Sequence, residues 1–306
     1  MNPARLHAYI YLVITSFIWG IAAIVIKLTL KGIEPLAFLT YRFALSAIIG
    51  SLFLLGNRSS VIKLFKDKKI LLTAIIYSLL ATTIALGFLF IGLGKTTVLN
   101  LSLVDLTGPI MVAIFGVIFL KEHFTKQEKL GSIIAVTGAL ITLIGPSLLQ
   151  DKFGSTLLGN LLIFLYVLTD ATSSIFLKKL LRLEFSAFFL VNFSFIVAFI
   201  AIFPIALFKY SPVGLVHVVT TLPLPYHLGV WFMALASGTL GFYLRARAQK
   251  TIEIGEAGLF GYLISVFSAP LAILILNEKL TINLIVGAII IIIGILIAET
   301  KKRLYN

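Results

Sequence analysis

Long apolar stretches separated by short polar loops run along the whole chain. Most of them approach the roughly 20 residues that a helix needs to cross the ~30 Å hydrocarbon core of a bilayer. We assign ten such stretches, at residues 7–30, 35–56, 70–93, 97–120, 128–146, 156–177, 186–208, 227–248, 254–276 and 281–299. Strict alternation of apolar and polar residues, which marks membrane strands, is absent from them. The pattern predicts an all-α integral membrane protein with ten transmembrane helices.

A turn and the apolar stretch after it recur 156 positions later in the chain. At that shift Glu122, Thr125, Gly131 and Gly138 coincide with Glu278, Thr281, Gly287 and Gly294. We interpret this as an internal duplication within one domain, 1–306, with repeat one at 7–146 and repeat two at 156–299. Each half holds an odd number of predicted spans, so the second half would enter the membrane in the opposite orientation. That arrangement is typical of transporters with inverted repeats.

Composition supports a membrane protein and narrows its partners. Charged residues make up only 12% of the 306 residues, whereas apolar residues make up 60%. Soluble domains carry about 25% charged residues, so lipid must solvate most of this surface. The net charge of +13 is concentrated in the loops, so membrane topology explains it and we expect no nucleic-acid partner. The absence of cysteine excludes disulfides and thiolate metal sites.

The loops also predict the orientation of the chain. Eighteen of the 25 Lys and Arg residues, Arg245 and Arg247 among them, fall in segments on the side of the N-terminus, and five fall on the opposite side. Basic residues accumulate on the cytoplasmic side, so both termini are expected in the cytoplasm. The first apolar stretch is too long for a signal peptide and lacks a cleavage site. We therefore predict a multi-pass protein of the plasma (inner) membrane.

The beginning of the chain resembles a known family. Trp19-Gly20, Lys27 and the Pro35-to-Arg42 spacing, together with the glycine pattern that ends each half, are similar to the EamA-type branch of the drug/metabolite transporter superfamily. The resemblance implies a secondary transporter, with no cofactor, that exports a small metabolite such as an amino acid by alternating access. The second half departs from the pattern, because Pro109 aligns with Ser265 and its proline is Pro270 instead.

Two acids inside predicted spans are the main candidates for function. Asp105 and Asp170 lie near the middle of the bilayer by the helical rise of 1.5 Å per residue. A charged side chain there costs about 2.5–3.5 kcal/mol on insertion scales, so such residues usually serve a function. Each could hold a substrate ammonium group or a proton. The alternative is that each is a structural partner for a buried base or a hydroxyl on a neighbouring helix.

Proline strengthens the case for Asp105. Pro109 cannot donate a hydrogen bond to the carbonyl four residues earlier, and that carbonyl belongs to Asp105. We therefore expect Gly108 and Pro109 to break the helix beside a hydrated cavity, and Pro270 to do so in the second half. A plain proline kink is the alternative.

Arg42 matches the estimated depth of Asp105. We predict that the two residues form an ion pair in at least one conformation of the transport cycle. The alternative is that the Arg42 side chain extends to the outer interface.

The remaining candidates for substrate binding are polar or aromatic residues near the predicted midplane or the span ends. They are Trp19, Asn100, Tyr166, Tyr243, Glu256 and Tyr262. Glu256 could equally cap the start of its helix, where negative charge is favourable. The glycines at seven-residue spacing, including Gly138 and Gly294, predict close helix packing rather than chemistry.

Catalytic signatures are absent from the sequence. The four His residues show no metal-ligand spacing, and no P-loop, nucleophile elbow or dinucleotide fingerprint occurs. We expect no metal and no enzyme activity. The partners are a small-molecule substrate and the lipid bilayer, with proton coupling left open. A channel or lipid scramblase is the alternative function, and a polytopic membrane enzyme is a more distant one.

Overall fold

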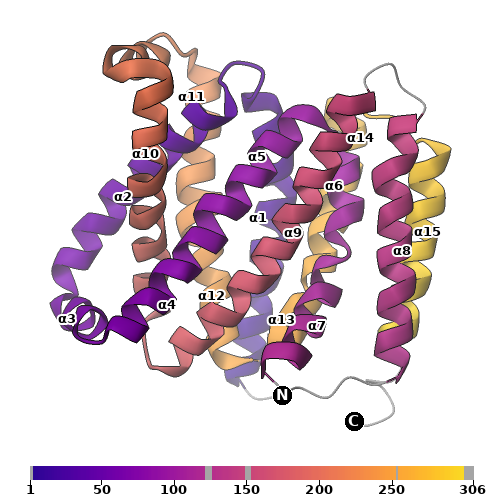
Figure 1. The fold of residues 1–306 in the computed structure, drawn as a ribbon, viewed down its shortest axis with the longest axis horizontal. Coiled ribbons are helices and arrows are strands. Elements are labelled where there is room, and N and C mark those ends of the chain that lie inside the picture. The colour runs from indigo at the N-terminus through magenta and orange to yellow at the C-terminus, as the bar shows by residue number, and fades with distance from the viewer. Residues whose placement is uncertain (1–2, 121–125, 149–152, 253, 300–306) are drawn as a thin grey trace.

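The computed structural model describes residues 3–120, 126–148, 153–252 and 254–299, and those ranges contain helices and no strand. The elements are α1 (Pro3–Thr29), α2 (Pro35–Gly56), α3 (Arg58–Lys66), α4 (Lys68–Ser78), η1 (Leu79–Ile84), α5 (Ala85–Lys95), α6 (Val98–Asp105), α7 (Gly108–Leu120), α8 (Lys126–Leu148), α9 (Phe153–Arg182), α10 (Ala187–Thr220), α11 (Leu224–Phe232), η2 (Met233–Gly241), α12 (Phe242–Thr251), α13 (Ile254–Leu259), α14 (Gly261–Leu276) and α15 (Ile282–Glu299). Figure 1 shows most of them side by side in one bundle.

Eight helical segments in the described ranges are long and apolar enough to cross a membrane. Two further apolar helical stretches, 129–141 in α8 and 282–294 in α15, are shorter. The prediction of an all-helical protein with many spans is therefore confirmed. The number of ten spans stays a prediction.

Two of the spans contain a π-helical segment. One span runs through α4, η1 and α5, and the other through α11, η2 and α12. A shift of 156 residues places Leu79–Ile84 of η1 inside Met233–Gly241 of η2. A π-helical turn bonds i to i+5 and occurs frequently at functional sites. A functional site is therefore expected near these two segments of the bundle.

Two other spans are interrupted. One breaks between Asp105, where α6 ends, and Gly108, where α7 begins. The break coincides with Pro109, whose missing N–H removes the hydrogen bond to the Asp105 carbonyl. The second half differs from our expectation, because α14 runs through Pro270 without interruption and its break lies at Phe260. One lost hydrogen bond is tolerated within a membrane helix, so a proline alone does not end it.

Two lysines join helix ends in matching positions. The Nζ of Lys27 donates to the carbonyls of Leu93 (2.6 Å) and Thr96 (2.5 Å) at the end of α5. Lys178 on α9 donates to the carbonyls of Gln249 (2.6 Å) and Ile252 (2.7 Å) at the end of α12. These carbonyls have no helical partner, and a cation is favourable at a helix C-terminus. Both acceptor pairs are related by the same 156-residue shift.

The last helices of the two halves, α8 and α15, lie side by side (Figure 1). A Cβ added to Gly138 would lie 2.8 Å from the backbone nitrogen of Ile291, and one added to Gly294 would lie 2.5 Å from that of Ala135. Only glycine permits this approach of two backbones. The predicted close packing of these glycines is confirmed, and van der Waals contact of this kind associates helices in lipid.

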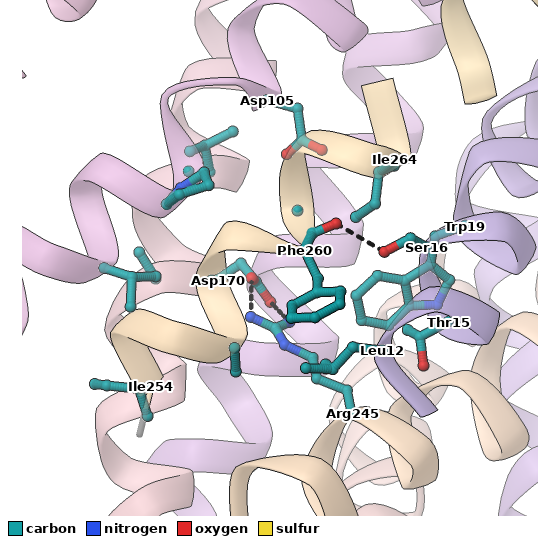
Figure 2. Close-up of a pocket in the computed structure, with 18 of the residues that line it drawn as sticks. Leu12, Thr15, Ser16, Trp19, Asp105, Asp170, Arg245, Ile254, Phe260 and Ile264 are labelled. Atoms are coloured by element: carbon teal, nitrogen blue, oxygen red, sulfur yellow. Dashed lines mark hydrogen bonds and ion pairs between the residues drawn. The ribbon is translucent and has the colours of Figure 1, made fainter. Parts of the chain in front are cut away.

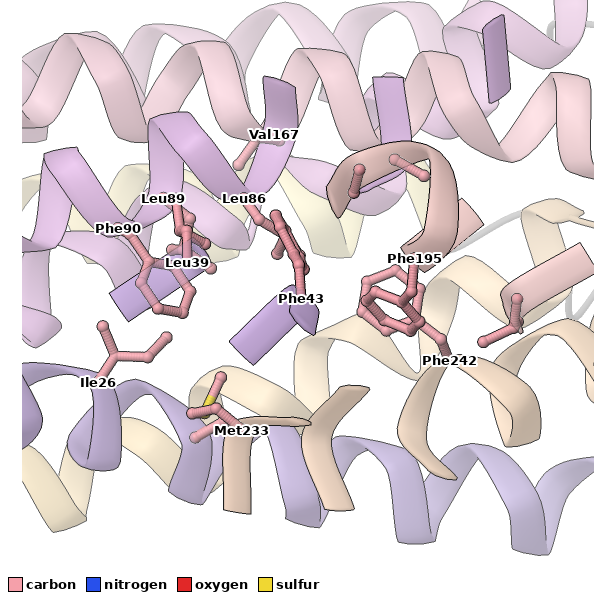
Figure 3. Close-up of a cluster of buried hydrophobic side chains, with 14 of the residues drawn as sticks. Ile26, Leu39, Phe43, Leu86, Leu89, Phe90, Val167, Phe195, Met233 and Phe242 are labelled. Carbon is pink, nitrogen blue, oxygen red and sulfur yellow. The ribbon is translucent and has the colours of Figure 1, made fainter. Parts of the chain in front are cut away.

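The main apolar core spans both halves. Figure 3 shows Ile26 of α1, Phe43 of α2 and Phe90 of α5 near Phe195 of α10 and Met233 of η2. These five side chains are at most 2% exposed. The core therefore holds helices from the two halves together around the polar residues described next.

Candidate functional site

Two neighbouring cavities lie inside the bundle and share part of their walls. We name them by the base that lines only one of them: the Arg245 cavity, of about 70 Å³, and the Arg42 cavity, of about 50 Å³. The side chains common to both are Trp19, Asp105, Tyr166, Asp170 and Ile264. A water molecule needs about 10–15 Å³, so each cavity has room for several. Figure 2 shows the Arg245 cavity with Trp19 and the two acids around it.

Asp105 faces both cavities from the broken end of α6. Within the described ranges, no hydrogen bond or ion pair reaches its carboxylate. Figure 2 shows it apart from the other charged groups of the cavity. The carboxylate is thus available for a cation or a proton. Gly108 and Pro109 line the Arg245 cavity beside it, so the helix break contributes directly to this wall.

Asp170 is already paired. Two nitrogens of Arg245, Nη1 and Nη2, donate to its two carboxylate oxygens at 2.9 and 2.8 Å, and Nη2 also donates to Ser174 at 3.0 Å. The Arg245 side chain is 17% exposed and the Asp170 side chain is 21% exposed. A two-point contact of this kind fixes both groups and neutralises their charge. Of the two alternatives for Asp170, the structure shows a pairing with a buried base.

The position of Arg245 corrects the sequence analysis, which assigned this residue to a cytoplasmic segment. Helix α12 continues to Thr251, so Arg245 lies within the span and faces a cavity. Its guanidinium also lies over the ring of Trp19, 5.4 Å from the centroid. The available signal was its location inside the predicted span 227–248, three residues before the end.

Trp19 is held by the π-helical segment of the second half. Its indole Nε1 donates to the carbonyl of Ser237 at 3.0 Å, and its ring meets Phe242 edge to face at 5.3 Å. Ser237 belongs to η2. Trp19 thereby forms a fixed aromatic wall shared by the two cavities, and its part in substrate binding stays a prediction.

Arg42 is the most unusual residue of the bundle. It is 0% exposed, and none of its three side-chain nitrogens has a hydrogen-bond partner among the described residues. Its guanidinium carbon lies 5.4 to 5.9 Å from the ring centroids of Phe43, Phe90 and Phe195. Burial rules out extension to the outer interface in this structure. The ion pair with Asp105 is not formed here and stays a prediction for another conformation.

Other predicted residues separate into those inside and those outside the cavities. Tyr166 lines both cavities, whereas Tyr262 lines neither. Asn100 also lies outside, where it donates to Thr96 (2.8 Å) and to Asn160 (3.0 Å). This buried cluster joins α6 to α9, so the structure gives Asn100 a structural role.

Glu256 and Tyr243 contact charged partners away from the cavities. Glu256 accepts a hydrogen bond from Arg5 at 2.7 Å and another from the hydroxyl of Tyr9. Tyr243 accepts one from Arg247 at 2.9 Å. Neither residue lines a cavity wall. In the part of the chain that the structure describes, no group of three His, Asp or Glu residues is placed to hold a metal ion.

Comparison with known proteins places these features in a family. The model of the EamA-like transporter family matches the chain twice, at residues 6–144 and 157–300. The chain is 24% identical to the uncharacterized transporter YyaM of Bacillus subtilis (strain 168), over 99% of this chain and 97% of the relative. It is 26% identical to the uncharacterized transporter YetK of the same organism, over 98% and 88%. A solved crystal structure is similar to this chain with a TM-score of 0.62 and 14% identity, over 100% of each chain. This similarity shows the fold.

Proposed function

Because this chain belongs to the EamA-like transporter family, we propose that it is a secondary transporter that exports a small metabolite such as an amino acid across the plasma membrane. The observation that carries the proposal is the Asp105 carboxylate, which faces two cavities and has no partner among the described residues. An unpaired acid in a buried cavity is suited to hold the ammonium group of a cargo or to exchange a proton.

The helix breaks support alternating access. The break after Asp105 contributes Gly108 and Pro109 to the Arg245 cavity, and the break of the second half contributes Phe260 and Gly261 to the same cavity. Interrupted helices at the interface of two repeats are the usual construction of a transport site. We propose that the halves are inverted repeats and that movement at these breaks exposes the cavities to each side of the membrane in turn.

The Asp170–Arg245 pair has a different role in this mechanism. Its mutual neutralisation leaves Asp105 as the acid that is free to respond to cargo. The pair fixes α9 to α12 and positions Trp19 through the guanidinium. We therefore assign cargo binding to Asp105 and positioning to Asp170 and Arg245.

Uptake into liposomes tests the function. The purified protein is reconstituted, and entry of labelled amino acids, amines, nucleosides and sugar phosphates is followed with and without a pH gradient. We expect saturable uptake of at least one amino acid by the wild type. Asp105→Asn should lose this uptake, and Asp67→Asn should retain it. Asp67 is the matched control, since it is exposed and caps α4, where Asn serves equally well.

The same assay separates the alternatives. Flux that rises linearly with concentration, without saturation or counterflow, would indicate a channel, and movement of labelled lipid would indicate a scramblase. Saturable uptake that ignores the pH gradient in the wild type would remove protons from the mechanism. If none of the compounds in the panel is taken up, the proposed transport of a small metabolite is contradicted.

A further inference from the structure

Arg42 is a buried charge that the mechanism above does not use. It is 0% exposed, and its Nε, Nη1 and Nη2 atoms have no acceptor among the described residues. Unsatisfied buried donors are unfavourable, and a buried unpaired charge is more so. Contacts with three phenylalanine rings offset only part of this, because a ring face attracts a cation without accepting its N–H groups in the manner of an oxygen.

The surroundings of Arg42 leave room for an acceptor. Arg42 lines the cavity that also contains Asp105, and a Cβ added to Gly238 would lie 3.3 Å from its Nη2. The lack of a side chain at Gly238 therefore leaves the space beside the guanidinium free. Much of the remaining wall is apolar, from Ala22, Ile26, Leu86, Leu89, Leu101 and Met233.

One cavity thus offers an unpaired cation, an unpaired anion and an apolar wall. A guanidinium presents a planar fork of donors that matches the two oxygens of a carboxylate. The carboxylate of Asp105 matches an ammonium group, and the wall matches an aliphatic body. A zwitterion would satisfy both charges at once and would bring no net charge into the membrane.

We propose that Arg42 is the receptor for the carboxylate of a zwitterionic cargo, an α-amino acid with an apolar side chain whose ammonium group lies at Asp105. This assignment rests on the proposed transport function. In the conformation described here Arg42 and Asp105 both lack a partner among the described residues, so the amino acid would supply one charged group to each.

Ligands that lack one charge test the assignment. Binding to the purified full chain is measured by isothermal calorimetry with leucine, leucinamide, 4-methylpentanoate and 3-methylbutylamine. Wild type is expected to bind leucine more tightly than the three others. In Arg42→Met the affinity for leucine should fall about 30-fold or more, as expected for the loss of a buried charged contact, and the affinity for leucinamide should hardly change.

Three further variants sharpen the result. Asp105→Asn should show the mirror image, losing the preference for leucine over 4-methylpentanoate while keeping the preference over leucinamide. Arg42→Lys should keep part of the affinity, since it retains the charge without the planar fork. Arg58→Met, the same exchange at an exposed position at the start of α3, should behave as wild type.

Thermal unfolding distinguishes binding from a structural role. Arg42 has no hydrogen-bond partner among the described residues, and its ring contacts offset only part of the cost of burying its charge, so Arg42→Met should unfold at a temperature no lower than wild type. A clearly lower temperature would overturn the assignment, and so would an undiminished preference of Arg42→Met for leucine over leucinamide. If wild type transports compounds of the panel but does not distinguish leucine from leucinamide, only the assignment fails. If it binds and transports none, the proposed function fails with it.

Discussion

The two halves of the molecule share their scaffold and differ in their charges. Lys27 and Lys178 each donate to two carbonyls at the end of a neighbouring helix, and the two sets of carbonyls are 156 residues apart. The π-helical segments η1 and η2 follow the same shift. These shared features satisfy backbone groups or shape the helices, which both halves require in lipid.

The cavity shows no such equivalence. At the same shift, Asp105 coincides with Gly261 and Arg245 coincides with Leu89. Helix α10 of the second half has no Lys or Arg before Lys209, so nothing there corresponds to the buried Arg42 of α2. The first half contributes unpaired charges and the second half contributes a complete ion pair. Two halves with shared structural features can therefore hold an asymmetric site, and the following experiments probe each side of this difference.

The largest effect is expected from the ion pair of the second half. Asp170→Asn leaves the buried Arg245 without its counter-charge, and the free energy of unfolding should fall by about 3 kcal/mol. Asp105→Asn removes an acid that has no partner among the described residues, so the free energy should change by less than about 0.5 kcal/mol. Denaturant unfolding followed by tryptophan fluorescence provides both values. Equal losses would show that Asp105 is also engaged in a stabilising pair.

The two lysines test whether equivalent contacts in the two halves contribute equally to the free energy of unfolding. Lys27→Met and Lys178→Met each lose two charged hydrogen bonds, and each should lower the free energy of unfolding by about 1.5–3 kcal/mol. The two lysines have no acceptor in common, so the losses should add within about 0.5 kcal/mol in the double variant. Lys66→Met, at an exposed position, is the control. If only one variant is destabilised, the two contacts have the same geometry but contribute unequally to stability.

The glycines test the contact between the final helices of the halves. Gly294→Ala would place a Cβ 2.5 Å from the backbone of Ala135, and Gly138→Ala would place one 2.8 Å from that of Ile291. Overpacking of this kind should lower the free energy of unfolding by about 1–3 kcal/mol. Gly87→Ala meets no atom within 4 Å and should stabilise its helix by about 0.5 kcal/mol. An unaffected thermal midpoint in Gly294→Ala would show that α8 and α15 separate easily.

The smallest effect concerns an exposed contact between the halves. Glu34, in the loop before α2, accepts hydrogen bonds from Lys209 and Tyr210 of α10, both at 2.6 Å. The hydrogen bond from Lys209, followed by that from Tyr210, lowers the pKa of the Glu34 carboxyl. A depressed pKa stabilises the folded state above the usual value of about 4.3, and this stabilisation is lost as the pH falls further.

The corresponding measurement compares wild type with Glu34→Gln from pH 7 to pH 3. The thermal midpoint of wild type should be slightly higher at pH 7, and the difference should vanish below the lowered pKa of Glu34. A difference that persists at pH 3 would mean that the carboxylate charge is not responsible.

Local features of the site could be predicted from the sequence. The break after Asp105 was predicted from Gly108 and Pro109 together, because glycine weakens a helix and the missing proline N–H removes the bond to the Asp105 carbonyl. Close packing at Gly138 and Gly294 follows from small residues on one helix face. The two acids were identified as candidates because charged groups are scarce in these spans, Trp19 because of its predicted midplane depth and Tyr166 because it lies one turn before Asp170, and all four line the cavities. Asn100, Glu256, Tyr243 and Tyr262 line neither cavity in this structure, and a part for them in binding stays a prediction.

Apolar length was enough to predict the membrane class and the helical spans, and repeated residues predicted an internal duplication. Which charges come into contact depends on how the helices pack, and the sequence pattern did not reveal it. Arg245 follows the π-helical segment η2, and each extra residue in a wide turn rotates the helix after it by about 100°, so its direction cannot be read from a period of 3.6. Asp170 pairs with Arg245, which lies 75 residues away in the sequence. Arg42 has no partner among the described residues, although its predicted depth is similar to that of Asp105. The direction of a side chain, and not its depth alone, therefore determines which groups come into contact.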